Sequence, residues 1–246
     1  MRRFVMLAVL LVGAVALLVG CSDDDEENAL LALSFLGVED LGDDYVYEGW
    51  ILVDGTPIST GTFTVDEMGV PDESQFMVNS AHLAAATKFI LTIEPSPDPS
   101  PDPSLTKYLA GDFSGNSADL TVADGDALGT DFNSATGDYI LNTPSTAGDD
   151  SDYTNGIWWL DPNAGPGPSL TLPNLPNGWV YEGWIVGNSG PISTGRFTSV
   201  SGDDSDLAGP TSGDDPPPPF PGQDFIDPGI DLTLGYAAVI SVEPEP

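Results

Sequence analysis

Apolar and polar residues alternate along two stretches of the chain, residues 45–64 and residues 179–198. In the first stretch, the alternation places Tyr47 on one face of an extended strand, and it places Glu48 and Trp50 on the other face. An Asp-Gly pair follows at positions 54–55, which is a strong signal for the turn of a β-hairpin. Each stretch therefore predicts a strand, a tight turn and a second strand.

The two stretches are copies of each other. Thirteen of their 20 aligned positions are identical, without a gap, at a constant offset of 134 residues. Identity of this extent indicates an internal duplication. The shared spacing of Trp, Gly, Pro and Phe implies that both copies follow the same backbone path.

Further strands are predicted on either side of the hairpins. They fall at residues 29–38, 75–78, 87–93, 105–109, 118–122, 139–143, 156–160 and 235–242. Residues 80–86 are long enough for one or two helical turns. By the last strand the offset has grown to 149 residues, and we expect the additional residues to form a long exposed Pro/Asp-rich loop at 201–228. Short strands separated by Gly, Pro and Asp turns predict an all-β fold of two tandem antiparallel β-sandwich-like domains.

The amino terminus predicts a bacterial lipoprotein. Two arginines precede an almost wholly apolar run at residues 4–19, and Leu18-Val-Gly-Cys21 has the form of a lipobox. The run is short for a membrane-spanning helix, so we interpret it as a cleaved signal, with an uncleaved anchor helix as the alternative. The predicted organisation is a signal peptide at 1–20, an acidic tether at 21–29, a first β-sandwich repeat at 30–123 and a second at 124–246.

Cys21 is the predicted site of lipid attachment. It is the only cysteine in the chain, so the mature protein would hold no disulfide and no free thiol. Two or more acyl chains on this residue would anchor the protein stably in a membrane, predicting a cell-envelope, outer-membrane lipoprotein on its periplasmic or surface-exposed side. The acidic run at residues 23–27 is a solvated tether, and it also resembles the surface-export signal of some Gram-negative lipoproteins.

The charge balance restricts the partners. The chain has a net charge of −34, and removal of residues 1–20 takes away Arg2 and Arg3 but no acid, which leaves −36. Nucleic acid and anionic lipid surfaces are excluded as partners, because binding phosphate requires the opposite charge. Screening of the repulsion in a saline habitat explains the acidity better than a dedicated cation-binding function does.

The hairpin and the strand after it resemble a known family. Trp50-Ile-Leu-Val-Asp-Gly-Thr-Pro-Ile-Ser-Thr-Gly-Thr-Phe63 and the later Ile93-Glu-Pro95 resemble the extracytoplasmic C-terminal domain of anti-sigma-K factors. The second copy resembles it at its own Trp, Pro, Ser, Gly and Phe positions and at Val242-Glu-Pro244. The resemblance implies a β-sandwich module outside the cytoplasm, used for sensing or contact. The sigma-binding helical domain and the transmembrane helix of that family are missing, so sequestration of a sigma factor does not carry over.

Candidate catalytic residues are few. Glu48 and Glu182 lie beside tryptophans, where a raised pKa would suit a general acid, and Glu94 or Glu243 nearby would complete a carboxylate pair. Their presence in both copies favours a structural role instead. His82 is the only histidine and no nucleophile motif accompanies it. With one histidine and no available cysteine, a zinc site is excluded, and we predict no catalytic residue, no metal centre and no cofactor.

Two kinds of ligand remain as candidates. Calcium has hard oxygen ligands available at 124–126, 149–152 and 203–206, although none of these matches a twelve-residue calcium loop. A sugar-binding face would need exposed aromatic residues, and we expect the neighbouring Trp158 and Trp159 to point to opposite faces, with one exposed or lying between the domains. Other tryptophans and tyrosines of the hairpins are expected in the core.

The favoured function is a non-catalytic interaction or sensing module of the cell envelope. It would hold duplicated anti-sigma-factor-like extracytoplasmic domains on a lipid anchor, facing an unidentified envelope protein or glycan. An adhesin-like protein that binds carbohydrate or calcium is the alternative, and an enzyme is the third hypothesis.

Overall fold

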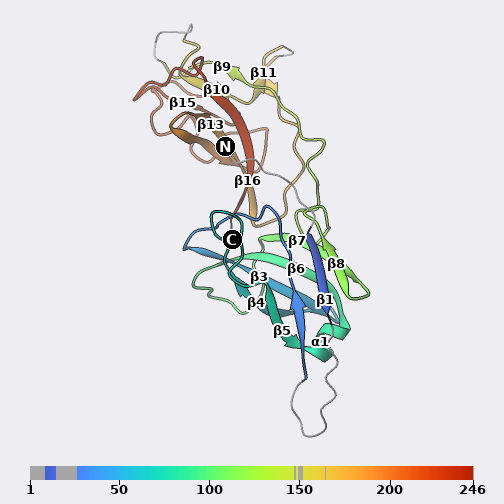
Figure 1. The fold of residues 1–246 in the computed structure, drawn as a ribbon. Coiled ribbons are helices and arrows are strands. Elements are labelled where there is room, and N and C mark those ends of the chain that lie inside the picture. The colour runs from blue at the N-terminus through green and yellow to red at the C-terminus, as the bar shows by residue number, and fades with distance from the viewer. Residues whose placement is uncertain (1–8, 15–26, 147, 149–151, 164, 246) are drawn as a thin grey trace. The chain divides into compact units, whose positions relative to one another are not determined.

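The computed structural model describes residues 9–14, 27–146, 148, 152–163 and 165–245, and of residues 9–14 only the backbone. The chain divides into two compact units. Unit 1 consists of Met1–Asp131, Pro176–Gly178 and Pro246, and unit 2 of Phe132–Leu175 and Trp179–Glu245. Both units consist almost entirely of antiparallel strands (Figure 1), which confirms the all-β prediction.

The division between the units falls eight residues after the boundary that we predicted at 123/124. Ala127 packs against Trp50 and Ile90 in one buried cluster, so the segment that follows the last strand of unit 1 covers its tryptophan. Apolar contact, rather than the composition of the segment, places these residues with the first unit.

Unit 1 is one eight-stranded sheet that curls on itself. Its strands are β1 (Val9–Ala14), β2 (Asn28–Ala32), β3 (Tyr45–Val53), β4 (Thr56–Phe63), β5 (Gln75–Asn79), β6 (Ala86–Pro95), β7 (Lys107–Ser114) and β8 (Ser117–Leu120). They follow the order β4-β3-β6-β7-β8-β1-β2-β5. The first and last strands of that order approach each other, since the rings of Phe63 on β4 and Phe76 on β5 are 6.1 Å apart.

Aromatic side chains fill the space that this curled sheet encloses. Phe63 also stacks on Phe35 at 5.2 Å and on Tyr47 at 5.4 Å, and all three rings are buried. The hairpin between β3 and β4 turns at Asp54 and Gly55, which both have positive φ. That geometry is the turn in which Asp-Gly pairs are favoured, because its twist matches the strands.

Strand β1 differs from what we predicted for the amino terminus. Residues 9–14 lie within the predicted signal peptide, and the structure places their backbone between β2 and β8 (Figure 1). The rest of the predicted signal, Cys21 and most of the tether lie outside the described residues. Among the helices of the described residues, none combines the length and apolarity needed to cross a membrane.

Unit 2 packs two small sheets face to face. Its strands are β9 (Ile140–Leu141), β10 (Gly156–Trp158), β11 (Leu160–Asp161), β12 (Gly167–Pro168), β13 (Trp179–Gly187), β14 (Gly190–Phe197), β15 (Gly222–Asp224) and β16 (Ala237–Pro244). They form sheets β14-β13-β16, β15-β10-β9 and β11-β12. Ile157 on β10 joins Tyr181 and Ile185 on β13 in one apolar cluster, so this core lies between the first two sheets.

The predicted short helix is confirmed as α1 (Ser80–Ala85), which Asn79 caps by accepting bonds from two backbone N–H groups. The prediction of an exposed loop at 201–228 is wrong in part. Its proline run is largely exposed, but Asp204, Ala208, Phe220 and β15 are buried. Phe220 packs with Trp158, and this apolar contact folds the insertion onto the unit instead of leaving it in solvent.

Candidate functional site

The two predicted hairpins have the same pairing in their respective units. β3 lies between β4 and β6, and β13 lies between β14 and β16. Trp50 pairs with Ile90 of β6, and Trp184 pairs with Val239 of β16. These pairs are offset by 134 residues in the hairpin and by 149 in the third strand, the two offsets expected from the sequence. Each tryptophan therefore occupies the same position in its own sheet.

A buried indole, a hydroxyl and a carboxylate form a chain of hydrogen bonds in unit 1. Trp50 Nε1 donates to Thr92 Oγ1 at 2.9 Å, and the Thr92 hydroxyl donates to the carboxylate of Glu94. Glu94 also accepts the backbone N–H of Ser104 at 2.9 Å, which ties down the end of the loop after β6. Thr92 is 0% and Glu94 1% exposed. The glutamate of the Glu-Pro motif thus satisfies buried polar groups.

Unit 2 repeats this chain of bonds with one exchange of residue type. Trp184 Nε1 donates to Ser241 Oγ at 2.8 Å, and Ser241 donates to the carboxylate of Glu243. Trp184 is only half-buried, whereas Trp50 is buried. The same contacts therefore lie in a more solvent-accessible setting in the second unit.

A second carboxylate in each unit bonds to the neighbouring strand of the hairpin. Ser59 donates its hydroxyl proton to Glu48, and Ser193 donates to Glu182 at 2.6 Å. Both glutamates are buried. These bonds join β3 to β4 and β13 to β14 beside a bulge in each pair, where the regular ladder is interrupted. They stabilise the same irregularity in both hairpins.

A tyrosine in each unit anchors the segment that precedes its hairpin. The hydroxyl of Tyr47 donates to the carbonyl of Glu39 at 2.9 Å, and that of Tyr181 donates to the carbonyl of Pro173 at 2.6 Å. Burial raises the pKa of Tyr181 to about 12 and the pKa of Tyr47 beyond the usual tyrosine range. Both phenols therefore stay protonated and continue to donate at neutral pH.

One substitution makes the two glutamate sites electrostatically different. Arg196 Nε donates to Glu182 at 2.9 Å, whereas the aligned position in the first copy is Thr62. Glu48 has no such cation beside it, and burial raises its pKa, opposed by the Ser59 hydrogen bond and assisted by the charge of Glu94. The buried carboxylate of unit 2 is charge-paired, and that of unit 1 is held by hydroxyl contact.

The geometry gives the glutamates a structural role. Glu48 pairs across the sheet with Thr92, two residues from Glu94, so the two carboxylates share a face of the sheet. Each one is bonded to its own hydroxyl, and they are 8% and 1% exposed. A general acid must reach its substrate, and these carboxylates instead point into the fold. His82, the other catalytic candidate, is exposed on α1.

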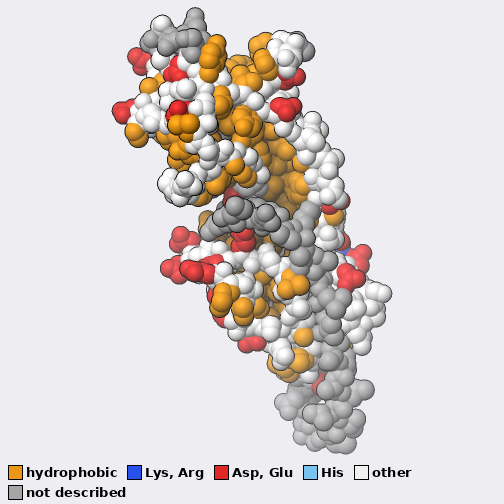
Figure 2. All heavy atoms as spheres, turned by 45° about the horizontal axis from the view of Figure 1, so that its top comes forward, with side chains coloured by type: hydrophobic (Ala, Val, Ile, Leu, Met, Phe, Trp, Pro, Cys, Tyr) orange, Lys and Arg blue, Asp and Glu red, His pale blue; other side chains and the backbone are white. Residues whose placement is uncertain are grey.

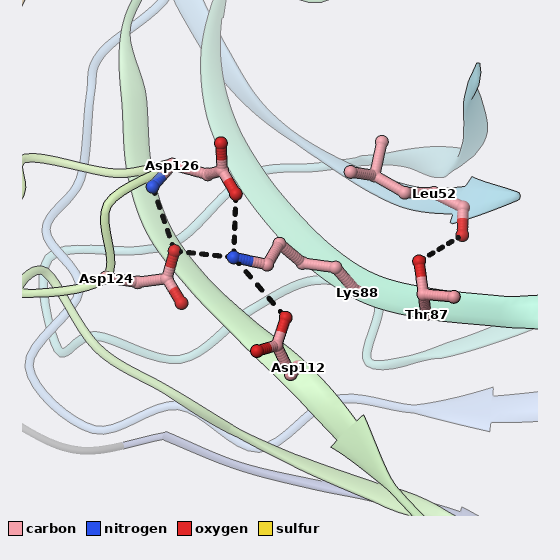
Figure 3. A network of polar contacts seen from close by, with 6 residues as sticks. All are labelled: Leu52, Thr87, Lys88, Asp112, Asp124 and Asp126. Carbon is pink, nitrogen blue, oxygen red and sulfur yellow. Dashed lines mark hydrogen bonds and ion pairs between the residues drawn. The ribbon is translucent and has the colours of Figure 1, made fainter. Parts of the chain in front are cut away.

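Lys88 is surrounded by carboxylates. Its Nζ lies 2.8 Å from Asp124, 2.7 Å from Asp126 and 3.4 Å from Asp112, and Figure 3 shows the three side chains converging on it. Burial lowers the pKa of Lys88, but its bonds to Asp124 and Asp126 outweigh this and raise the pKa above the usual value. The lysine supplies the positive charge that a bound cation would supply.

This contact bears on the calcium candidates. Asp124 and Asp126 of the first candidate loop already bond Lys88. Asp152 accepts bonds from Thr154 and Asn155, while the rest of its loop lies outside the described residues. Across the residues that the structure describes, no group of three or more His, Cys, Asp or Glu side chains is arranged to hold a metal ion.

The expectation that Trp158 or Trp159 is exposed, or lies between the domains, is wrong. They are 0% and 4% exposed and belong to different cores of unit 2. Trp158 Nε1 donates to the carbonyl of Asn142 at 3.0 Å, and Trp159 meets the ring of Tyr139 edge-on at 5.8 Å. Neighbouring strand residues do point to opposite faces, as predicted, but both faces of this short sheet are covered.

Two buried carboxylates of unit 2 were missed by sequence reasoning. Asp204 accepts the backbone N–H of Gly222 at 2.8 Å, and Asp224 accepts the backbone N–H of Ser145 at 3.1 Å. Burial, together with the neighbouring Asp206, raises the pKa of Asp204 to about 8. The aromatic residues that flank β15, Phe220 and Phe225, were the signal that the acidic segment is buried.

Comparison with known proteins supports an anti-sigma-factor type of domain for the first unit. Residues 6–106 match the family model described as "Anti-sigma-K factor rskA, C-terminal". The matched range includes the β3–β4 hairpin, β6 and the Glu-Pro motif of the first copy, on which the resemblance was based. Neither the curated proteins nor the solved structures yield a significant match to the chain.

Proposed function

We propose that the chain is a lipid-anchored cell-envelope protein whose two units are duplicated anti-sigma-factor-like extracytoplasmic domains, and that it acts as a non-catalytic interaction or sensing module. The observation that carries this proposal is the family match over residues 6–106. Regulation by an anti-sigma factor operates through contact rather than chemistry. The buried glutamates agree with that, because their oxygens are used to hold strands together.

Duplication of the domain follows from the repeated contacts. The tyrosine–carbonyl, glutamate–serine and tryptophan–hydroxyl–glutamate bonds all recur in the second unit with matching register. Such bonds depend on side chains from several strands, so their joint recurrence is unlikely to arise from two unrelated sequences. We assign both units to one ancestral module.

Anchoring through acylated Cys21 would fix the module to the envelope membrane. In this proposal residues 1–20 are removed, and with them the backbone of β1. β2 and β8 would then lose the strand that lies between them. The processed chain must therefore fold without β1, which makes the proposed address testable through folding as well as through lipidation.

Metabolic labelling with palmitate tests the anchor directly. Wild-type protein should incorporate the label and fractionate with the envelope membrane, and Cys21→Ala should lose both properties. Ser22→Ala is the matched control, since it changes the next residue and keeps the acylated thiol. Unlabelled wild-type protein, or a mature mass that still includes residues 1–20, would contradict the proposal.

The folding test uses a chain that begins at Cys21. We expect it to unfold in one or two cooperative transitions in urea, with the near-ultraviolet circular dichroism of packed tryptophans. If this chain is molten or aggregates while the full chain folds, β1 is part of the native unit. Residues 1–20 would then be retained, and the lipid anchor would be excluded.

A further inference from the structure

Strand β16 leaves one edge of a sheet open. It is the last strand in the order β14-β13-β16, and no other strand of the described residues pairs with its outer edge. Ala237 is exposed and Val239 is 40% exposed. An open edge presents unpaired backbone N–H and C=O groups, which other chains can use for strand addition.

Unit 1 shows what occupies this position in the same framework. There the outer edge of β6 pairs with β7, and Ala110 lies opposite Ile90. Ala110 is fully buried and clusters with Ile90 and Trp50. The framework thus completes itself with an antiparallel strand that places a small residue beside the partner of its tryptophan.

The open edge lacks the features by which proteins protect such edges. Residues 237–242 read Ala-Ala-Val-Ile-Ser-Val and contain neither a charge nor a proline, in a chain with 39 acidic residues. The other edge of the same sheet, β14, contains Pro191 and Arg196. Charge and proline are the usual devices against edge pairing, and β16 has neither before Glu243.

We propose that β16 pairs with β16 of a second copy of this chain, antiparallel and symmetric about Ala238. In this register Val239 lies opposite Ala237 of the second copy. A small residue is then placed beside Val239 and Trp184, as Ala110 is placed beside Ile90 and Trp50. The two three-stranded sheets become one sheet of six strands. Pairing through the same patch on both copies is the usual arrangement of a twofold dimer.

The charge of the chain permits this contact in salt. Glu243 lies five residues from the symmetry axis, so its two copies are about 33 Å apart along the strands at roughly 3.3 Å per residue. This exceeds the Debye length, which is about 10 Å at 0.1 M salt. Repulsion between the remaining acidic surfaces is long-range, so dimerisation should strengthen as the salt concentration rises.

Sedimentation of the full chain measures the association. We expect a monomer in 0.05 M NaCl and about twice that mass in 2 M NaCl. Val239→Lys should weaken the dimer at least tenfold, because it places an ammonium against Trp184 and Ala237 of the second copy. Asn188→Lys adds the same charge in the exposed turn between β13 and β14, and it should dimerise as well as wild type.

Engineered cysteines test the register. Ala238→Cys lies at the axis and should form a disulfide-linked dimer, since opposing residues of an antiparallel pair lie about 4.5–5.5 Å apart. In Val242→Cys the two thiols are about 26 Å apart and should not link. Wild type reports any link through Cys21. A monomer at every salt concentration, equal linking by both variants, or capture of a foreign strand instead of a second copy would overturn the proposal.

Discussion

Lys88 is the single cation among three aspartates, and its removal should destabilise unit 1. Lys88→Met keeps the apolar stem but leaves Asp124, whose side chain is only 15% exposed, beside two like charges. We expect the free energy of unfolding to fall by about 2–3 kcal/mol, the usual cost of losing a charged hydrogen-bond partner. Urea denaturation measures the loss.

Lys107→Met is the matched control for this substitution. Lys107 is the other lysine of the chain and lies on the neighbouring strand β7. It should cost well under 1 kcal/mol, as expected for a residue outside such a cluster. Equal losses in the two variants would show that removal of positive charge in general, and not this contact, matters.

Asp204 should make the stability of unit 2 depend on pH. Its pKa in the folded chain is about 8, against an ordinary value of 3.8. Between these values the folded state keeps a proton that the unfolded state has lost. The stabilisation is therefore complete below about pH 4 and is lost as the pH rises towards 8, by at most about 1.4 kcal/mol per pH unit.

Asp204→Asn removes this titration and keeps an oxygen for the N–H of Gly222. Denaturation of wild type and variant between pH 5 and 9 should show the wild type losing stability relative to the variant as the pH rises. Asp203→Asn, at the exposed neighbouring position, should leave the wild-type slope unchanged. Parallel curves for wild type and Asp204→Asn would mean that Asp204 is ionised in the fold.

The hydroxyl between indole and glutamate should matter more in β6 than in β16. Thr92→Val preserves side-chain shape but leaves the Trp50 N–H and the Glu94 carboxylate short of a partner in a fully buried position. We expect a loss of about 2–3 kcal/mol. Ser241→Ala removes the equivalent bond beside the half-buried Trp184, where water can replace it, so about 1 kcal/mol is expected. Equal losses would contradict the difference in exposure.

The central strands were predictable because their signals are local. The Asp-Gly turn, the alternation around Trp50 and the Glu-Pro end of β6 are each decided within a few residues. The changing offset between the copies also gave the correct register of β16 against β13. The Glu48 and Glu182 contacts are made by these same strands, so their repetition was visible before the structure.

The remaining elements depend on contacts between distant segments. Gly222–Asp224 forms a strand only because β10 pairs with it, some 65 residues earlier in the chain. Residues 9–14 read equally well as a signal and as a strand, since both are short apolar runs. The burial of Trp158 requires Phe220 from the insertion. Local composition marked that insertion as solvated and could not indicate the aromatic contact.

The net charge of −34 is spread over the surface of the chain. Figure 2 shows acidic side chains scattered over the face that it presents, and the described residues contain only Lys88, Lys107 and Arg196 as basic partners. Folding brings these like charges closer together than in the extended chain. Self-repulsion therefore opposes the compact state and is reduced when salt shortens the Debye length.

Salt should stabilise the folded chain whatever cation carries the charge. Raising NaCl from 0.05 M to 1 M shortens the Debye length from more than 10 Å to about 3 Å, and a gain of about 2 kcal/mol would raise the melting temperature by roughly 4–8 °C for a chain of this size. MgCl₂ and CaCl₂ at equal ionic strength should give the same rise as each other, because screening depends on charge and concentration. A specific site would instead respond to millimolar calcium and not to magnesium. Since Lys88 already occupies the best-formed carboxylate cluster of unit 1, we expect no such excess, and a calcium-specific shift would restore the cation-binding interpretation that the acidic loops first suggested.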